Sequence, residues 1–208
     1  KEIAGDILTP LYLGSDPADK LIAWLFYFAA AHPDKKQKLV AELDNVTEGK
    51  EVTFAHLPQL TYFEMFLNET LRLRGPYCLL LREALQDDLI RGYTIPKHSQ
   101  IFIPTNLVQK HPGSWENPDN FYPERFENTT AKNNIAFIPF SKGTRACLGQ
   151  HYACRQALFV FARALQQFDF NLHADSYNFS GTTLTPNNSN PPFPAIPLTL
   201  PLLDNFVQ

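Results

Sequence analysis

Apolar residues recur at helical spacing in four stretches of the chain, and this pattern predicts four long helices. The first stretch is Ile3–Ala31, and its pattern is interrupted at Gly14-Ser15-Asp16-Pro17, where a proline removes a helical hydrogen bond. His32-Pro33 ends this helix, because a residue before proline disfavours helical geometry. The other three helices are predicted at Asp34–Asp44, Thr61–Arg74 and Cys147–Phe168.

Shorter runs that are bounded by turn residues predict strands. Their predicted bounds are Cys78–Leu81, Leu89–Arg91, Tyr93–Ile95 and Gln100–Ile103, followed near the end of the chain by Phe170–Leu172 and Ala195–Leu200. Prolines cluster in residues 94–134 and 185–201, which are expected to be largely irregular, with a long meander at 110–134. The predicted fold class is therefore mainly α with small β-sheets.

Composition and charge narrow the class of protein. With 208 residues and 44% hydrophobic residues, the chain is long enough to bury a core. A net charge of −3 gives no indication of nucleic-acid binding. The three cysteines form no C-x-x-C pair, so neither a structural zinc site nor a disulfide framework is expected, and a reducing compartment is the default. No signal-peptide pattern is visible, and the apolar run Leu21–Ala31 is shorter than the roughly 20 residues that span a bilayer.

Cys147 stands at the predicted start of the last helix, where several neighbours suit a metal-bound thiolate. Helix amides and the cation of Arg145 favour a thiolate over a thiol. Gly143 can adopt a positive φ that folds the backbone around the sulfur, and Phe140 can shield the sulfur from water. Gly149 has no Cβ, so a large flat cofactor can lie close to the backbone. The alternative is a small cysteine buried at a helix start.

These residues complete the pattern F-x-x-G-x-R-x-C-x-G, with Phe140, Gly143, Arg145, Cys147 and Gly149 at its fixed positions. The pattern resembles the haem-ligand loop of the cytochrome P450 family. The resemblance implies a cytochrome P450-like fold, haem b as the cofactor, and Cys147 as the axial ligand of its iron. It also implies that Arg145 pairs with a haem propionate in a charge-assisted contact.

Three other residues occur in the order of that family's Glu-Arg-Arg triad. Glu69 and Arg72 lie three residues apart on one face of a predicted helix, and Arg125 follows in the meander. The resemblance implies a structural role, in which one carboxylate accepts from two guanidinium groups and braces the cysteine loop. The alternative is an exposed ion pair that contributes little to stability. Arg82, after the first predicted strand, resembles an arginine that reaches a haem propionate in the family; its alternative is a simple exposed arginine.

The first helix departs from the family at Leu13-Gly14-Ser15-Asp16-Pro17. This segment resembles the Ala/Gly-Gly-x-Asp/Glu-Thr segment whose acid and threonine help to deliver protons to dioxygen over the haem. Gly14 and Asp16 match, so Asp16 is the candidate catalytic acid. Pro17 replaces the threonine and carries no hydroxyl group. Asp16-Pro17 equally fits an N-cap followed by a proline at the first helical position, which would occupy Asp16 in capping.

The resemblance treats residues 1–208 as a single partial domain, the C-terminal portion of a family member. Its parts are the oxygen-helix region 3–31, the E-x-x-R helix 61–74, the meander 110–134, the haem-ligand loop 137–149 and the final long helix 147–168. Three explanations for the missing half are open: a fragment, a second polypeptide that supplies the N-terminal half, or a decayed gene product. An intracellular location is expected, either cytoplasmic or membrane-associated through an absent N-terminal segment.

The implied function is a haem-thiolate monooxygenase that inserts oxygen from dioxygen into a small apolar organic substrate. Electrons would come from an electron-donor protein, because the chain has no nicotinamide or flavin motif. Lys142 and Arg155 mark a candidate docking face for that donor. One alternative is a peroxide-driven or rearranging haem-thiolate enzyme, for which the missing threonine matters less. The other is a non-catalytic haem-binding or structural remnant.

Overall fold

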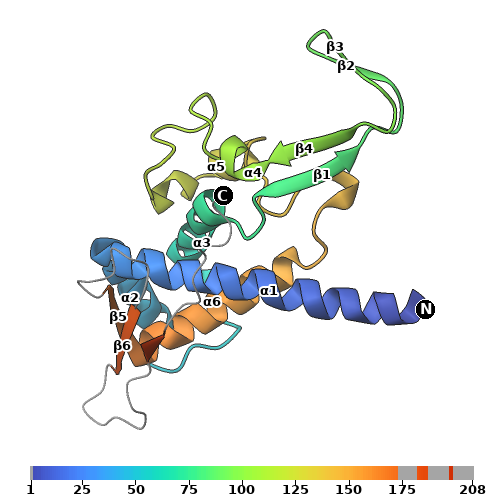
Figure 1. The fold of residues 1–208 in the computed structure, drawn as a ribbon. Helices are drawn as coiled ribbons and strands as arrows, with labels where there is room; N and C mark the ends of the chain where they lie inside the picture. The colour runs from blue at the N-terminus through green and yellow to red at the C-terminus, as the bar shows by residue number, and fades with distance from the viewer. Residues whose placement is uncertain (1, 173–181, 187–196, 199–208) are drawn as a thin grey trace.

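Four long helices form the body of the chain. The computed structural model describes residues 2–172, 182–186 and 197–198. The helices are α1 (Glu2–Ala31), α2 (Pro33–Thr47), α3 (Thr61–Arg74) and α6 (Gln150–Gln167). Helix α1 packs against the other three, and its first turns project beyond the other elements (Figure 1). Helix α3 has the predicted bounds.

The interior of the helical body is aromatic and aliphatic. Phe161 of α6 is fully buried, and its ring centroid lies 5.4 Å from Phe26, 5.7 Å from Phe63 and 5.8 Å from Phe66. These rings come from α1, α3 and α6, so one side chain joins three helices. Buried leucines from the other elements complete this core, namely Leu39 and Leu43 of α2, Leu67 and Leu71 of α3, and Leu158 and Leu165 of α6.

Helix α1 is continuous, so the predicted interruption at Gly14-Ser15-Asp16-Pro17 is wrong. Pro17 removes the amide that would bond to the carbonyl of Leu13, a loss that costs about 3 kcal/mol in a helix interior. The turns after Pro17 are anchored by buried Leu21 and Leu25, and each such side chain contributes about 1.5–3 kcal/mol. Tertiary burial therefore carries the helix through a residue that disfavours it.

The predicted start of the last helix is also wrong by three residues. Helix α6 begins at Gln150, with Gly149 at its N-cap, and the amide of Ala153 donates to the carbonyl of Gly149 at 2.9 Å. Cys147 lies in the preceding turn. Its amide donates to the carbonyl of Phe140 at 2.9 Å, which closes a loop rather than a helical turn.

Two antiparallel two-stranded sheets leave the helical body, and their four strands lie where strands were predicted. Strand β1 (Leu79–Glu83) pairs with β4 (Gln100–Pro104), and between them β2 (Asp88–Ile90) pairs with β3 (Tyr93–Ile95). Arg91-Gly92 connects β2 to β3 with φ of 50° and 87°. Positive φ at both positions is typical of the tight turn that matches strand twist. The β2–β3 hairpin forms the far tip of the molecule (Figure 1).

The meander contains only short elements, as its prolines predicted. They are α4 (Thr105–Val108) just before it, η2 (Pro123–Phe126) and α5 (Thr129–Asn133), while η1 (Leu57–Gln59) precedes α3 and η3 (Gly143–Arg145) lies in the cysteine loop. A second, smaller core holds the meander together around Trp115, Phe126 and Ala136.

A third sheet closes the described chain. Its order is β5 (Phe168–Leu172), β6 (Thr182–Pro186) and β7 (Pro197–Leu198), all antiparallel. Strand β5 was predicted in part, and β6 was missed because three threonines and a final proline give no apolar alternation. Of the predicted strand Ala195–Leu200, residues 197–198 form β7 and the others lie outside the described residues. The fold is thus mainly α with small antiparallel sheets, as predicted.

No helix among the described residues combines the length and the apolar composition needed to cross a membrane.

We predict that Phe161→Ala lowers the free energy of unfolding by about 3–5 kcal/mol, because it removes a fully buried ring that three helices share. Urea denaturation followed by circular dichroism measures this change. Val160→Ala is the matched control, because Val160 is 39% exposed on the same helix and its truncation changes stability by roughly 0.5 kcal/mol. Equal losses in the two variants would contradict the central position of Phe161.

Candidate functional site

The loop that carries Cys147 turns twice through left-handed backbone. Ser141 has φ 63° and Gly143 has φ 76°. The positive φ of Gly143 was predicted, whereas that of Ser141 was not, since serine carries no signal for this conformation. Between the two turns and the start of α6, η3 brings the chain round so that Cys147 bonds back to Phe140. The result is a closed loop with an exposed thiol.

Phe140 and Gly149 flank this thiol. Phe140 is half-buried and packs against the main core. That its ring shields the sulfur of Cys147 from water stays a prediction. A Cβ at Gly149 would lie 3.9 Å from the sulfur of Cys147, which is ordinary contact. The packing of the chain itself therefore does not require glycine at this position.

A hollow of about 710 Å³ opens beside the loop. Arg82 of β1 and Arg145 of η3 both line it, although they are far apart in the sequence. The Nη2 atom of Arg82 lies 2.5 Å from the hydroxyl oxygen of Ser141. Arg145 is exposed and has no hydrogen bond or ion pair within the described part of the chain. The structure thus brings the two arginines with a predicted propionate role to one site.

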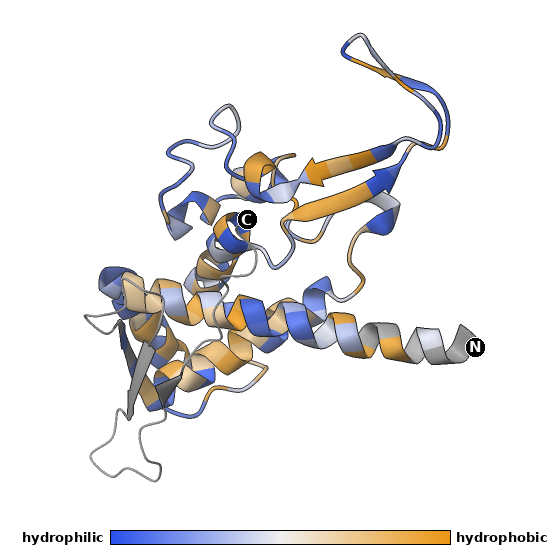
Figure 2. Ribbon diagram, viewed as in Figure 1, coloured by the Kyte–Doolittle hydropathy of each residue, from blue (hydrophilic) through white to orange (hydrophobic). Residues whose placement is uncertain are grey.

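Exposed apolar side chains occur both next to Cys147 in the chain and in the hollow. Leu148, next to Cys147, is 101% exposed, and Leu81 and Leu85 in the hollow are exposed too. Figure 2 shows hydrophobic residues along β1 and β4 and on the first half of α1. An apolar disc with acidic side groups and a metal that accepts a thiolate matches this donor set. The residues present therefore fit haem.

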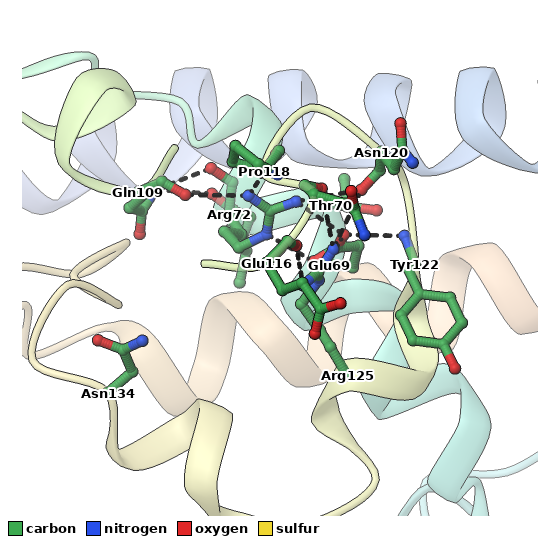
Figure 3. Close-up of polar contacts among 12 residues, drawn as sticks. Glu69, Thr70, Arg72, Gln109, Glu116, Pro118, Asn120, Tyr122, Arg125 and Asn134 are labelled. Atoms are coloured by element: carbon green, nitrogen blue, oxygen red, sulfur yellow. Dashed lines mark hydrogen bonds and ion pairs between the residues drawn. The ribbon is translucent and has the colours of Figure 1, made fainter. Parts of the chain in front are cut away.

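Glu69, Arg72 and Arg125 meet under the meander (Figure 3). The carboxylate of Glu69 is fully buried and accepts hydrogen bonds from Nε and Nη2 of Arg72, at 2.7 and 2.8 Å. Arg125 donates from Nε to Glu69 at 3.0 Å, and the amide of Tyr122 donates at 2.9 Å. The alternative of an exposed ion pair is excluded for Glu69 and Arg72, whose side chains have no exposed area.

The two guanidinium groups use their remaining donors on meander carbonyls. Arg72 donates to the carbonyls of Gln109 at 3.0 Å and Pro118 at 2.7 Å, and Arg125 donates to that of Glu116 at 3.0 Å. A charged group out of water needs such partners, because desolvation is costly when donors stay unpaired. One buried carboxylate therefore holds α3, Tyr122 and several meander carbonyls in a single network.

Gln109 extends this network toward the cysteine loop. Its Nε2 donates to the carbonyls of Leu71 and Arg72 at 3.1 Å each, and its Oε1 accepts from the amide of Ile138 at 3.0 Å. Ile138 is the second residue of the cysteine loop, residues 137–149. Gln109 was not predicted from the sequence, where a glutamine before a lysine gives no sign of a buried position.

The predicted catalytic acid, Asp16, lies half-buried on α1. Its carboxylate pairs with Lys20 at 2.7 Å, one turn later, and this hydrogen bond raises the pKa of Lys20. Asp16 does not cap a helix, because α1 runs through it without a break. The hydroxyl of Ser15 donates to the carbonyl of Leu11 at 3.0 Å.

Tyr77 lies between α3 and β1. Burial raises the pKa of its phenol, and the nearby carboxylate of Asp16 adds to the rise.

Comparisons with known proteins agree with this geometry. The family model described as cytochrome P450 matches residues 1–189. The chain belongs to the cytochrome P450 family. It is 33% identical to cytochrome P450 71D18 of Mentha gracilis over 82% of this chain and 35% of the relative. It is 34% identical to germacrene A acid 8-beta-hydroxylase of Helianthus annuus over 80% of this chain and 35% of the relative. It is 33% identical to cytochrome P450 3A6 of Oryctolagus cuniculus over 82% of this chain and 35% of the relative.

This cytochrome P450 chain spans about a third of the length of the curated relatives that it matches. The Cys147 loop, the Glu69 network and the altered segment around Asp16 all lie within the match to the family model.

Cys154 is the other cysteine near the site, one turn into α6. Burial raises the pKa of the Cys154 thiol to about 12, with smaller contributions from Glu64 and Cys147. A thiol with this pKa is protonated at neutral pH and is a poor metal ligand. Cys147, which is exposed, is the better candidate.

We predict that Arg125→Ala lowers the free energy of unfolding by about 2–3 kcal/mol, because the buried Glu69 loses a charged donor. The same variant should release bound hemin faster, if the network braces the loop. Thermal unfolding and hemin transfer to an acceptor protein measure the two effects. Lys132→Ala is the control: its pair with Glu64 at 2.9 Å is partly exposed and contributes about 0–1 kcal/mol. Unchanged hemin retention in Arg125→Ala would remove the bracing role.

Proposed function

We propose that this chain is the cofactor-binding part of a haem-thiolate oxidoreductase that inserts oxygen from dioxygen into a small apolar organic substrate. The observation that carries the proposal is the exposed Cys147 thiol on a closed loop, beside a hollow lined by Arg82 and Arg145. The relative named as a hydroxylase supports the reaction class. Electrons would come from a donor protein, because the chain carries no nicotinamide or flavin motif.

Each residue would have a distinct task at haem b. Cys147 would bind the iron through its sulfur, while Arg82 and Arg145 would bind the two carboxylates of the porphyrin. Phe140 would limit the access of water to the sulfur, and the chain's glycine at 149 would leave room for the ring. When bound, haem with a thiolate ligand supplies the oxygen chemistry, which the electron-rich sulfur promotes.

The Glu69 network would take no part in the chemistry and would only fix the position of the cysteine loop. It ties α3 to the meander, and Gln109 connects α3 to Ile138 at the start of the cysteine loop. A catalytic thiolate must be held to within a fraction of an ångström, since small displacements change reaction rates strongly. We infer that a buried network of this kind supplies that rigidity.

A second candidate function rests on Pro17. Proline has no hydroxyl, the hydroxyl of Ser15 is engaged with the carbonyl of Leu11, and the carboxylate of Asp16 is paired with Lys20. The segment of residues 13–17 therefore offers neither a free hydroxyl group nor an unpaired carboxylate to move a proton toward dioxygen. This arrangement favours a haem-thiolate enzyme that uses peroxide or rearranges an oxygenated substrate, in which no proton is needed to activate dioxygen.

We predict that Cys147→Ala abolishes thiolate-type haem binding. The reduced, carbon-monoxide-treated protein should show a strongly red-shifted Soret band, and this band should be absent from the variant. Cys154→Ala is the matched control and should keep the band, because its thiol is protonated and partly buried. Retention of the same spectrum in Cys147→Ala would end the ligand assignment. A complete lack of a Soret band in the unaltered chain would favour a non-catalytic remnant.

We predict, for the second candidate, that hydrogen peroxide without any reductant supports turnover of apolar test substrates. Pro17→Thr restores a hydroxyl group and should increase turnover that depends on dioxygen and reductant by about 100-fold, the lower end of the usual range of proton-transfer contributions. Product formation under the two conditions measures both effects. Reductant-driven turnover that is already as fast in the unaltered chain would rule out the second candidate.

A further inference from the structure

Ser141 is a non-glycine residue in left-handed backbone. Its φ of 63° lies in the region that side chains other than asparagine and aspartate rarely adopt. Glycine adopts this conformation at no steric cost. Non-glycine residues in such a strained conformation cluster at active sites and ligand-binding sites. The group that serine adds is its hydroxyl.

The Ser141 hydroxyl has one described partner, and that partner is Arg82. The Nη2 atom of Arg82 donates to the hydroxyl oxygen at 2.5 Å, and Nη1 donates to the carbonyl of Leu81 at 2.8 Å. An arginine side chain has five N–H donors in one plane. Two contacts from two different nitrogens fix the orientation of that plane and leave the other donors for a ligand.

No carboxylate of the described residues neutralises Arg82. Glu83 lines the same hollow, but its carboxylate lies 2.6 Å from the Nδ1 of His98. Arg82 is half-buried, so its charge is less well solvated than that of a fully exposed arginine. A half-buried cation with a fixed orientation and no internal anion is suited to an external carboxylate.

We propose that Ser141 is a positioning residue, which aims the guanidinium of Arg82 into the hollow to bind a carboxylate of the porphyrin. The proposal rests on the proposed haem function, because haem b supplies that carboxylate. Ser141 touches neither the ring nor the iron; it acts through Arg82. The hydrogen bond also joins β1 to the cysteine loop, so the carboxylate site and the thiol are held by the same short segment.

The test compares hemin with hemin dimethyl ester, whose carboxylates are blocked. In Ser141→Ala, hemin should bind about 5- to 20-fold more weakly, in line with the loss of a hydrogen bond to a charged group. The ester should bind both proteins equally. In Arg82→Gln, hemin should bind at least as weakly as in Ser141→Ala. The double variant should bind hemin no more weakly than Arg82→Gln alone, because Ser141 would act only through Arg82.

Ser141→Gly is the control that separates the loss of the hydroxyl group from a loss of folding. It removes the hydroxyl while making the left-handed backbone easier, so its thermal stability without hemin should equal or exceed that of the unaltered chain. Its hemin affinity should fall as in Ser141→Ala. Full affinity in Ser141→Gly, an equal loss for the ester, or penalties that multiply in the double variant would each overturn the positioning role. If the unaltered chain itself bound no hemin, the proposed function would fall together with this inference.

Discussion

The buried carboxylate of Glu69 is the constraint on which the rest of the site depends. A charge without solvent must be neutralised and fully hydrogen-bonded, and only a specific arrangement of Arg72, Arg125 and the amide of Tyr122 does both. The two arginines in turn need acceptors, which the carbonyls of the meander provide. These hydrogen bonds hold the proline-rich meander in a single conformation, although it contains little regular secondary structure.

The start of the cysteine loop is connected to that network by hydrogen bonds of Gln109. The side chain of Gln109 bonds to the end of α3 and to Ile138, and the backbone carbonyl of the same residue accepts from Arg72, so one residue connects the start of the loop to the Glu69 cluster. The other end of the loop is set by α6, whose Phe161 is locked among rings of α1 and α3. Within the loop, left-handed backbone at Ser141 and Gly143 reverses the chain so that Cys147 is presented outward.

Helix α1 stays continuous in spite of a proline in its interior. Pro17 removes a hydrogen bond, and Asp16 turns to Lys20 instead of standing free. The helix survives because its later turns are buried in the main core. The turns that bury Leu21 and Leu25 and the segment that carries Asp16 and Pro17 are therefore different parts of one helix.

The sequence by itself determined the helices with a clear apolar stripe, the four short strands between residues 78 and 104 and the residues of the cysteine loop, because these depend on local periodicity and on turn chemistry. It also identified Glu69, Arg72 and Arg125, although not that the first two are wholly buried. Only the tertiary structure decided that α1 passes through Pro17, that Gln109 ties α3 to the loop, and that Ser141 holds Arg82. These features depend on contacts between residues far apart in the chain, and such contacts leave no periodic trace in the sequence.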